Sequence, residues 1–155
     1  MVFFTDRPFL SIKPPVNTVL PDVVLGKIHN PAEGNYSTAT GLIQFSKGDS
    51  GMLEMLLRSP VWFVDVEDVA KLHVAALIDE TVDRQRIWAA SAPFCASEVQ
   101  GALKEVKPDY KERDVSAYPP RPDIVIDNSK SIALLEKHYG SGFNALKTAV
   151  KANLL

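Results

Sequence analysis

The stretch WFVDVEDVAKLHVAALID, residues 62–79, predicts a strand that runs directly into a helix. Large and β-branched residues run together at 61–65 after Ser59-Pro60, as in a buried strand. Asp65 then suits a helix N-cap, and Asp68 places a second acid where the helix dipole favours one, so we predict a helix at 66–78. At helical spacing, the packed face is expected to hold Val66, Val69, Ala70, His73, Ala76 and Leu77.

Before this unit, apolar residues at 16–20 predict a strand that ends in a loop at Pro21-Asp22. The segment from Gly26 to Gly34 is rich in turn formers and predicts a loop over a surface or pocket. A helix is expected from Thr38 or Thr40 until residues 47–49 end it. The apolar cluster at 52–57 fits either a helix or irregular core.

After this unit, residues 86–90 predict a short strand, followed by a bend at 91–94. Ser97 and Gln100 form a capping-box pattern for a helix that Pro108 closes. Residues 109–123 hold three prolines and predict an ordered internal loop. Two helices are then expected, at 129–139 between Asn128 and Gly140 and at about 143–153. The pattern predicts one α/β domain over residues 1–155, a small sheet with flanking helices.

Composition excludes several classes of function. The formal net charge is −2 from 17 basic and 19 acidic residues, and no Lys/Arg run exceeds two residues, so we expect no nucleic-acid partner. Cys95 is the only cysteine, which excludes an intramolecular disulfide and gives no thiolate pattern for a metal. No apolar run approaches the ~20 residues of a membrane span. The sequence favours a cytoplasmic protein without a membrane or metal partner.

Four segments, in order and spacing, resemble a known family. They are NTVLPDVVLG at 17–26, WFVDVEDVAKLHVAALID at 62–79, RIWAASAPF at 86–94 and DNSKSIALLE at 127–136. The chain resembles, over about residues 15–150, the extended short-chain dehydrogenase/reductases of the dihydroflavonol-reductase and aldehyde-reductase type, especially fungal members. The resemblance implies the C-terminal, substrate-binding portion of that fold, without the N-terminal Rossmann half, and a naturally short reading frame is expected.

The sequence lacks the elements that the family uses for redox chemistry. No glycine-rich turn follows a strand, and Gly48-x-x-Gly51 has no apolar strand before it. The family also uses a Tyr followed four residues later by a Lys. None of the four tyrosines has this partner: Tyr36, Tyr110, Tyr118 and Tyr139. We expect no bound cofactor and no oxidoreductase activity from this chain by itself.

Asp22 and His29 are the candidate catalytic residues. The resemblance places Asp22 at the strand end that approaches the substrate, where a carboxylate serves as acid or base; the alternative is a turn carboxylate that caps nearby N–H groups. His29 follows in the pocket loop, where a near-neutral pKa suits proton transfer; the alternative is an exposed loop histidine. His73, on the apolar helix face, is expected to be a hydrogen-bonded core residue.

The predicted substrate-binding residues are Asp22, Val23, Trp62, Phe94 and Cys95. Phe94 is the favoured pocket residue, a residue such as Trp62 most often belongs to ordinary core, and Cys95 is expected to be a small pocket residue rather than a nucleophile.

The leading functional hypothesis is a stand-alone protein that binds a small carbonyl-containing or aromatic, polyketide-like metabolite. It would promote a non-redox step such as isomerisation, cyclisation or dehydration. One alternative is a non-catalytic binding or regulatory module. Another is a fragment of an NADPH-dependent reductase that needs a separate cofactor-binding chain. Because the resemblance implies an uncovered apolar surface, we also expect a homodimer.

Overall fold

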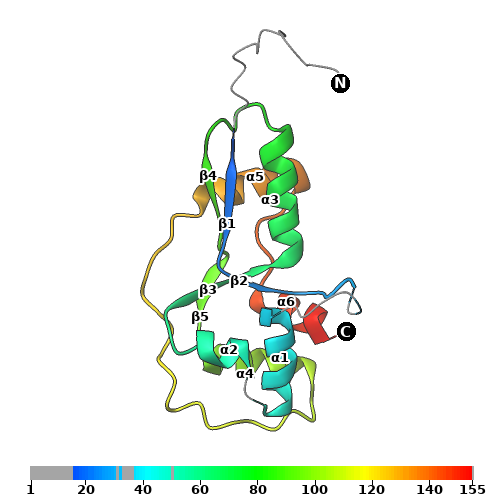
Figure 1. Ribbon diagram of the computed structural model, residues 1–155, viewed down its shortest axis with the longest axis vertical. Coiled ribbons are helices and arrows are strands. Elements are labelled where there is room, and N and C mark those ends of the chain that lie inside the picture. The colour runs from blue at the N-terminus through cyan, green and yellow to red at the C-terminus, as the bar shows by residue number, and fades with distance from the viewer. Residues whose placement is uncertain (1–15, 31, 33–36, 50, 155) are drawn as a thin grey trace, which may run out of the picture.

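The computed structural model describes residues 16–30, 32, 37–49 and 51–154, which form an α/β structure with two small sheets, drawn in Figure 1. The predicted loop at 26–34 therefore lies partly outside the described residues. The strands are β1 (Thr18–Pro21), β2 (Val23–Leu25), β3 (Val61–Asp65), β4 (Arg86–Ala89) and β5 (Ala92–Phe94). The helices are α1 (Ser37–Lys47), α2 (Met52–Leu56), α3 (Val66–Ile78), α4 (Ala96–Val106), α5 (Ser129–Tyr139) and α6 (Leu146–Leu154).

The strands divide between the two ends of the molecule. In one sheet β1 pairs with β4 in parallel, with Leu20 opposite Trp88. In the other, β2 pairs in parallel with β3, and β5 joins β3 antiparallel. The strand after Pro21 thus changes partner, because Asp22 separates β1 from β2 and its carboxylate accepts a hydrogen bond from the Trp62 N–H at 2.8 Å.

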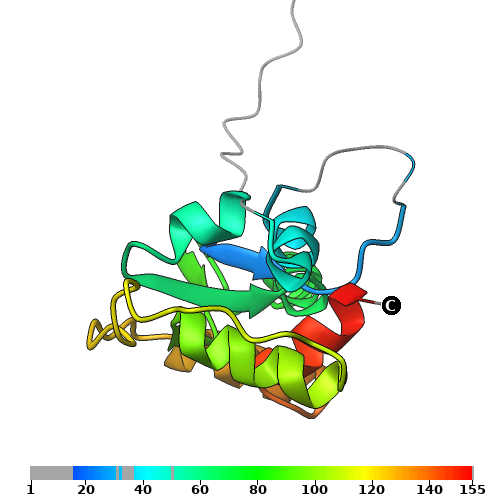
Figure 2. The same cartoon turned by 90° about the horizontal axis from the view of Figure 1, so that it is seen from below.

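Helices cover both faces of the β2–β3–β5 sheet. Figure 2 shows α1 and α2 on one face, and α4 and α6 on the other. The larger apolar core lies here, centred on fully buried residues of α1, α2, β5 and α4 such as Phe45, Leu53, Phe94 and Leu103. A parallel strand pair covered on both faces is the usual arrangement in α/β proteins, and it confirms the predicted fold class.

The β1–β4 sheet is covered on one face only. Ile87 and Ala89 of β4 are buried in a second core with residues of α3 and α5, including Leu72 and Leu135. Since side chains alternate along a strand, Arg86 and Trp88 point to the other face, and both are exposed. One side of this small sheet is therefore open to solvent.

Helix α3 has the predicted bounds but buries a different face. Its fully or largely buried residues are Asp68, Leu72, Ala75 and Ala76, whereas His73 is exposed and Leu77 is 84% exposed. The prediction of a core His73 was wrong: its Nδ1 lies 2.8 Å from the Val69 carbonyl oxygen of its own helix. The spacing of apolar residues predicted the wrong buried face of α3, because that face includes the carboxylate of Asp68. This carboxylate accepts a hydrogen bond from Asn144, far along the chain.

Several local predictions are corrected by hydrogen bonds that spacing did not indicate. The expected bend at 91–94 contains strand β5. Helix α4 is capped by Cys95, whose N–H donates to Glu98 Oε2 at 3.1 Å, rather than by the Ser97–Gln100 pair. Asn128 does not cap α5, because its side-chain amide donates to the carbonyl oxygens of Ala90 and Ser91.

Asp79 ties the end of α3 to α5. Asp79 is only 5% exposed, and its carboxylate accepts hydrogen bonds from Lys137 Nζ at 2.7 Å and from Thr81 Oγ1 at 2.7 Å. His138 Nε2 lies 2.8 Å away. The hydrogen bond from Lys137, followed by those from Thr81 and His138, holds the pKa of Asp79 well below its usual range. The ionised form is therefore the one that the fold stabilises.

Asp79→Asn should lower stability at neutral pH and flatten its dependence on acid. Because the folded-state pKa is depressed, the wild-type carboxylate stabilises the fold above its unfolded pKa of about 4, and this contribution is lost as the pH falls towards the folded value. Urea unfolding at intervals between pH 7 and pH 3 should show two curves that converge in acid. The exposed Asp83 offers a matched control, and parallel curves for wild type and Asp79→Asn would contradict the assignment.

Candidate functional site

A cavity of about 420 Å³ lies where the end of β2, the first turn of α1 and the first residue of α3 meet. Its apolar lining comes from Val24, Leu25, Ile28, Ala39 and Val66. The polar side chains of the lining are Lys27, His29, Asn30 and Thr38. An apolar cavity of this size with a few polar groups is typical of a small-molecule site.

Hydrogen bonds from distant parts of the chain hold the cavity wall in place. Thr38 Oγ1 donates to the Val24 carbonyl oxygen at 2.6 Å and joins α1 to β2. Asn153 of α6 is 4% exposed, and it accepts from the Gly26 N–H at 3.3 Å and donates to the Ala39 carbonyl oxygen at 2.9 Å. The carboxyl-terminal helix thereby connects two sides of the cavity. The sequence pattern did not single out Thr38 or Asn153 as site residues.

Gly26 occupies a corner of the cavity wall that has no room for a side chain. Its φ is +114°, and a methyl group added there would lie 3.1 Å from Val66 Cγ1 and 3.2 Å from the Asp65 carboxylate. Asp65 caps α3 as predicted, since its Oδ1 accepts from the Glu67 N–H at 2.8 Å. Burial raises the pKa of the Asp65 carboxyl, and this effect outweighs the hydrogen bond from the Glu67 N–H, which lowers the pKa. The corner therefore brings β2 close to the start of α3.

Gly26→Ala should destabilise the protein and deform the cavity. A residue with a Cβ is strained at this positive φ, and contact with Val66 adds to the strain, so we expect a loss of about 2 kcal/mol. Thermal unfolding would measure the loss, with Gly101→Ala as the control because a methyl group there meets nothing within 4 Å. Equal unfolding temperatures for Gly26→Ala and wild type would show that the corner is not tight.

Of the two predicted catalytic residues, His29 lies at the cavity and Asp22 does not. His29 is exposed and lines the cavity, as the prediction of a pocket loop requires. Asp22 does not line it; its carboxylate is hydrogen-bonded to the Trp62 N–H and joins the β1–β2 corner to β3. The structure thus supplies Asp22 with the alternative, structural role, and a catalytic role for either residue stays a prediction.

The other predicted binding residues lie mainly in the core. Val23 and Phe94 are 2% and 1% exposed, and Cys95 is buried with its Sγ 3.1 Å from Ser97 Oγ. Phe94 also borders another cavity, of about 300 Å³, whose lining includes Arg121. Trp62 is buried, and its indole N–H has no hydrogen-bond partner among the described residues. His29 and Phe94 thus belong to separate cavities.

The β3–α3 junction does not fit the pyrophosphate of a nicotinamide dinucleotide. Such a group needs a glycine-rich turn between a strand and a helix N-terminus that is free of negative charge. Here β3 continues directly into α3, whose N-terminus carries Asp65, Glu67 and Asp68. These three carboxylates would repel the phosphates.

The described part of the chain shows neither a metal-binding cluster nor a membrane-spanning helix. It contains no group of three or more His, Cys, Asp or Glu side chains arranged to hold a metal ion. None of its helices has the length and apolar character needed to cross a membrane.

The paired parallel strands and the helices that flank them place the chain among the α/β proteins. No family model matches the sequence. Ketoreductase adrE from Penicillium rubens is 34% identical over 143 residues, which cover 90% of this chain and 41% of that protein. Ketoreductase nvfG from Aspergillus novofumigatus is 34% identical over 139 residues, covering 87% of this chain and 39% of the relative.

Solved structures agree with this likeness in fold. Vestitone reductase from alfalfa superposes with a TM-score of 0.67 at 15% identity, covering 90% of this chain and 43% of that one. Gre2 from Candida albicans superposes with a TM-score of 0.62 at 23% identity, and the match covers 93% of this chain and 44% of that one. The chain is homologous to fungal extended short-chain dehydrogenase/reductases, and it spans about two fifths of the length of the curated relatives that it matches.

Proposed function

We propose that this chain is the ligand-selecting part of a ketoreductase-type short-chain dehydrogenase/reductase. It binds a small carbonyl compound with an aromatic or other apolar body in the cavity at the end of β2. A separate dinucleotide-binding part docks on the uncovered face of the β1–β4 sheet and supplies the redox group. Support for the carbonyl class comes from the ketoreductases among its relatives.

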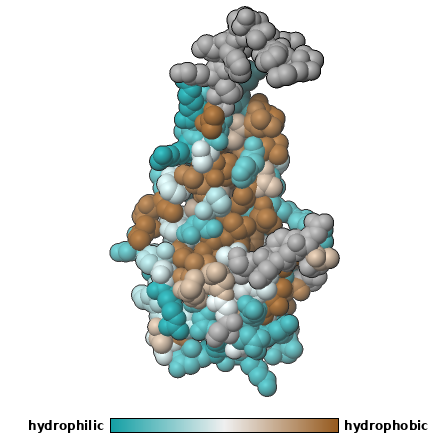
Figure 3. Space-filling view, viewed as in Figure 1, coloured by the Kyte–Doolittle hydropathy of each residue, from teal (hydrophilic) through white to brown (hydrophobic). Residues whose placement is uncertain are grey.

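The uncovered face is the observation that carries the proposal. Parallel strands are normally covered on both faces, yet Trp88 on β4 is 45% exposed. Figure 3 shows apolar side chains gathered on the side of the molecule that carries β1 and α3. Val74, Leu77 and Ile78 are further exposed apolar residues, on the helix that packs against the covered face. Exposed apolar surface of this kind typically marks an interface.

The cofactor-free step predicted from the sequence has less support. Of its two candidate acids or bases, His29 lines the cavity, but the carboxylate of Asp22 lies outside it and is engaged by the Trp62 N–H. The acidic N-terminus of α3 also does not fit the pyrophosphate of the dinucleotide. Both facts favour a chain that works with a second part.

The test combines the 155-residue chain with a separately expressed dinucleotide-binding part of the Penicillium rubens ketoreductase. The isolated chain should bind NADPH no more tightly than millimolar, and the mixture should consume NADPH in the presence of an aryl ketone. Micromolar NADPH binding by the isolated chain would overturn the proposal. Ketone turnover by the chain alone, lost in Asp22→Asn or His29→Ala, would support the cofactor-free alternative instead.

Trp88 provides a direct reporter of docking. The chain has two tryptophans, and Trp62→Phe removes the buried one without losing a side-chain hydrogen bond among the described residues. In that background, docking should bury Trp88 and shift its emission to shorter wavelength. Unchanged emission with a saturating partner would exclude this face as the docking surface.

In isolation, the chain is expected to form a homodimer through the same face, because a second copy removes the apolar residues from water. Light scattering at high micromolar concentration should give twice the mass of the 17.0 kDa chain. Trp88→Lys should return it to the monomer, since Trp88 is 45% exposed on the uncovered face of the β1–β4 sheet. A monomeric wild type would contradict this expectation.

A further inference from the structure

The polar groups in the wall of the β2–α1 cavity fall into two kinds. Three backbone groups already have protein partners: Thr38 Oγ1 satisfies the Val24 carbonyl, and Asn153 satisfies both the Gly26 N–H and the Ala39 carbonyl. A ligand therefore gains little from them, because binding there would only exchange one hydrogen bond for another. Recognition is left to side chains at the loop that follows β2.

Lys27 and His29 are the two basic side chains of that loop. Both are exposed and both line the cavity. The described lining contains no Asp or Glu. The carboxylate of Asp65 lies against Gly26, is 3% exposed and accepts a hydrogen bond from the Glu67 N–H. Lysine is only a donor, so the group that it recognises must accept hydrogen bonds, and a charged acceptor gives the stronger bond.

We infer that the cavity takes a carbonyl compound that also carries a carboxylate, with its apolar body against Val24, Ile28 and Val66 and its carboxylate at Lys27. This assignment rests on the proposed function and names the substrate class for the same site. Lys27 is the specificity-determining residue. Ala39, on the α1 side, lines the cavity, so a larger residue there is expected to exclude the apolar body.

The test compares phenylglyoxylate, an aromatic 2-keto acid, with its uncharged methyl ester by calorimetric titration of the full chain. The acid should bind about tenfold more tightly than the ester, as expected for one charge-assisted hydrogen bond near solvent. Lys27→Met should remove this preference and leave the ester's affinity unchanged. Lys130→Met, an equal charge change on α5 at a residue outside the cavity lining, should preserve it.

Ala39→Leu separates failure of this assignment from failure of the proposed function. If the acid and the ester bind equally, or if Lys27→Met keeps the preference, the carboxylate assignment is overturned. Loss of both ligands in Ala39→Leu would in that case still support the cavity as the carbonyl site. If neither compound binds wild type below millimolar concentration, or if Ala39→Leu binds both normally, the cavity is not the carbonyl site and the assignment falls with it.

Discussion

Asp68→Ala is expected to lower the free energy of unfolding by about 3 kcal/mol, because it removes a buried carboxylate and leaves its donors without a partner. Asp68 is 0% exposed. Its Oδ2 accepts from the Asn144 N–H at 2.7 Å, and its Oδ1 lies 3.3 Å from both Asn144 Nδ2 and Lys71 Nζ. These bonds fasten the start of α3 to the segment before α6.

Asp68→Asn is the matched variant, since it keeps one oxygen for the Asn144 N–H and nearly the same volume. It should lose less stability than the alanine variant. The exposed Glu67, one residue earlier on the same helix, serves as a surface control through Glu67→Ala, although its removal also takes one charge from the helix N-terminus. Urea denaturation measures all three. A loss for Asp68→Ala no larger than for Glu67→Ala would contradict the assigned role.

The same residue explains what sequence could predict about α3 and what it could not. The bounds of the helix follow from local signals, the Asp65 cap and the apolar run behind it, and they are confirmed. The buried face depends on Asn144, which lies 76 residues further along the chain. A pattern of apolar spacing counts Asp68 as solvent-facing, because it contains no information about a distant partner that satisfies a buried carboxylate.

The candidate site also has a part that the sequence predicts and a part that depends on distant segments of the chain. A loop of turn-forming residues after a strand predicts a pocket, and His29 does line one. The residues that fix the wall, however, come from α1 and from Asn153, 127 residues from Gly26. Phe94 and Val23 were predicted to bind the ligand, but the packing of α1, α2, α4 and α6 around β2–β3–β5 places both in the core. Only the three-dimensional arrangement separates a pocket wall from the core behind it.

Phe45→Ala should destabilise the protein even more than Asp68→Ala, with an expected loss of about 4 kcal/mol in the free energy of unfolding. Phe45 is 0% exposed on α1 and lies in the core cluster with Leu42 and Leu53. The Arg113 guanidinium carbon sits 4.8 Å from its ring centroid. Alanine would leave a cavity in this core and remove the aromatic surface on which Arg113 lies.

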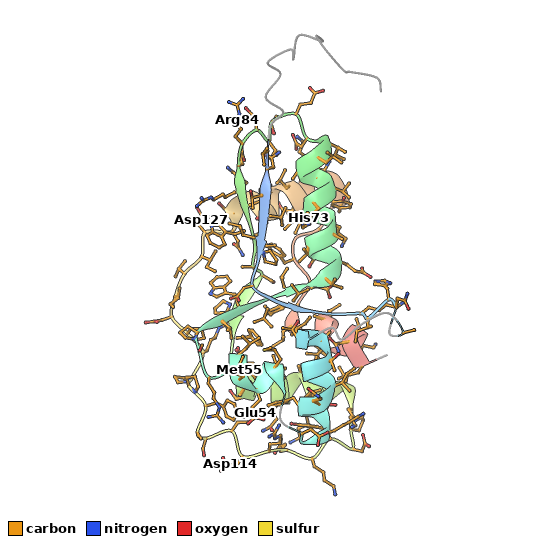
Figure 4. All side chains as sticks on the ribbon, viewed as in Figure 1. Glu54, Met55, His73, Arg84, Asp114 and Asp127 are labelled. Atoms are coloured by element: carbon orange, nitrogen blue, oxygen red, sulfur yellow. The ribbon has the colours of Figure 1, made fainter. Side chains whose placement is uncertain are left out.

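The variant also tests whether the core supports the ligand site, because α1 carries Phe45 at one end and the cavity residues Thr38 and Ala39 at the other. In Phe45→Leu, which keeps most of the apolar volume, the loss should stay below about 1.5 kcal/mol and ligand affinity should be retained. Figure 4 labels Met55 on the neighbouring helix α2, and Met55→Ala is the surface control because that side chain is 58% exposed. Urea denaturation and calorimetric titration with phenylglyoxylate measure the two effects. If Phe45→Ala is no less stable than Met55→Ala, then α1 is not anchored through this ring, and the cavity wall must be held by the Thr38 and Asn153 hydrogen bonds alone.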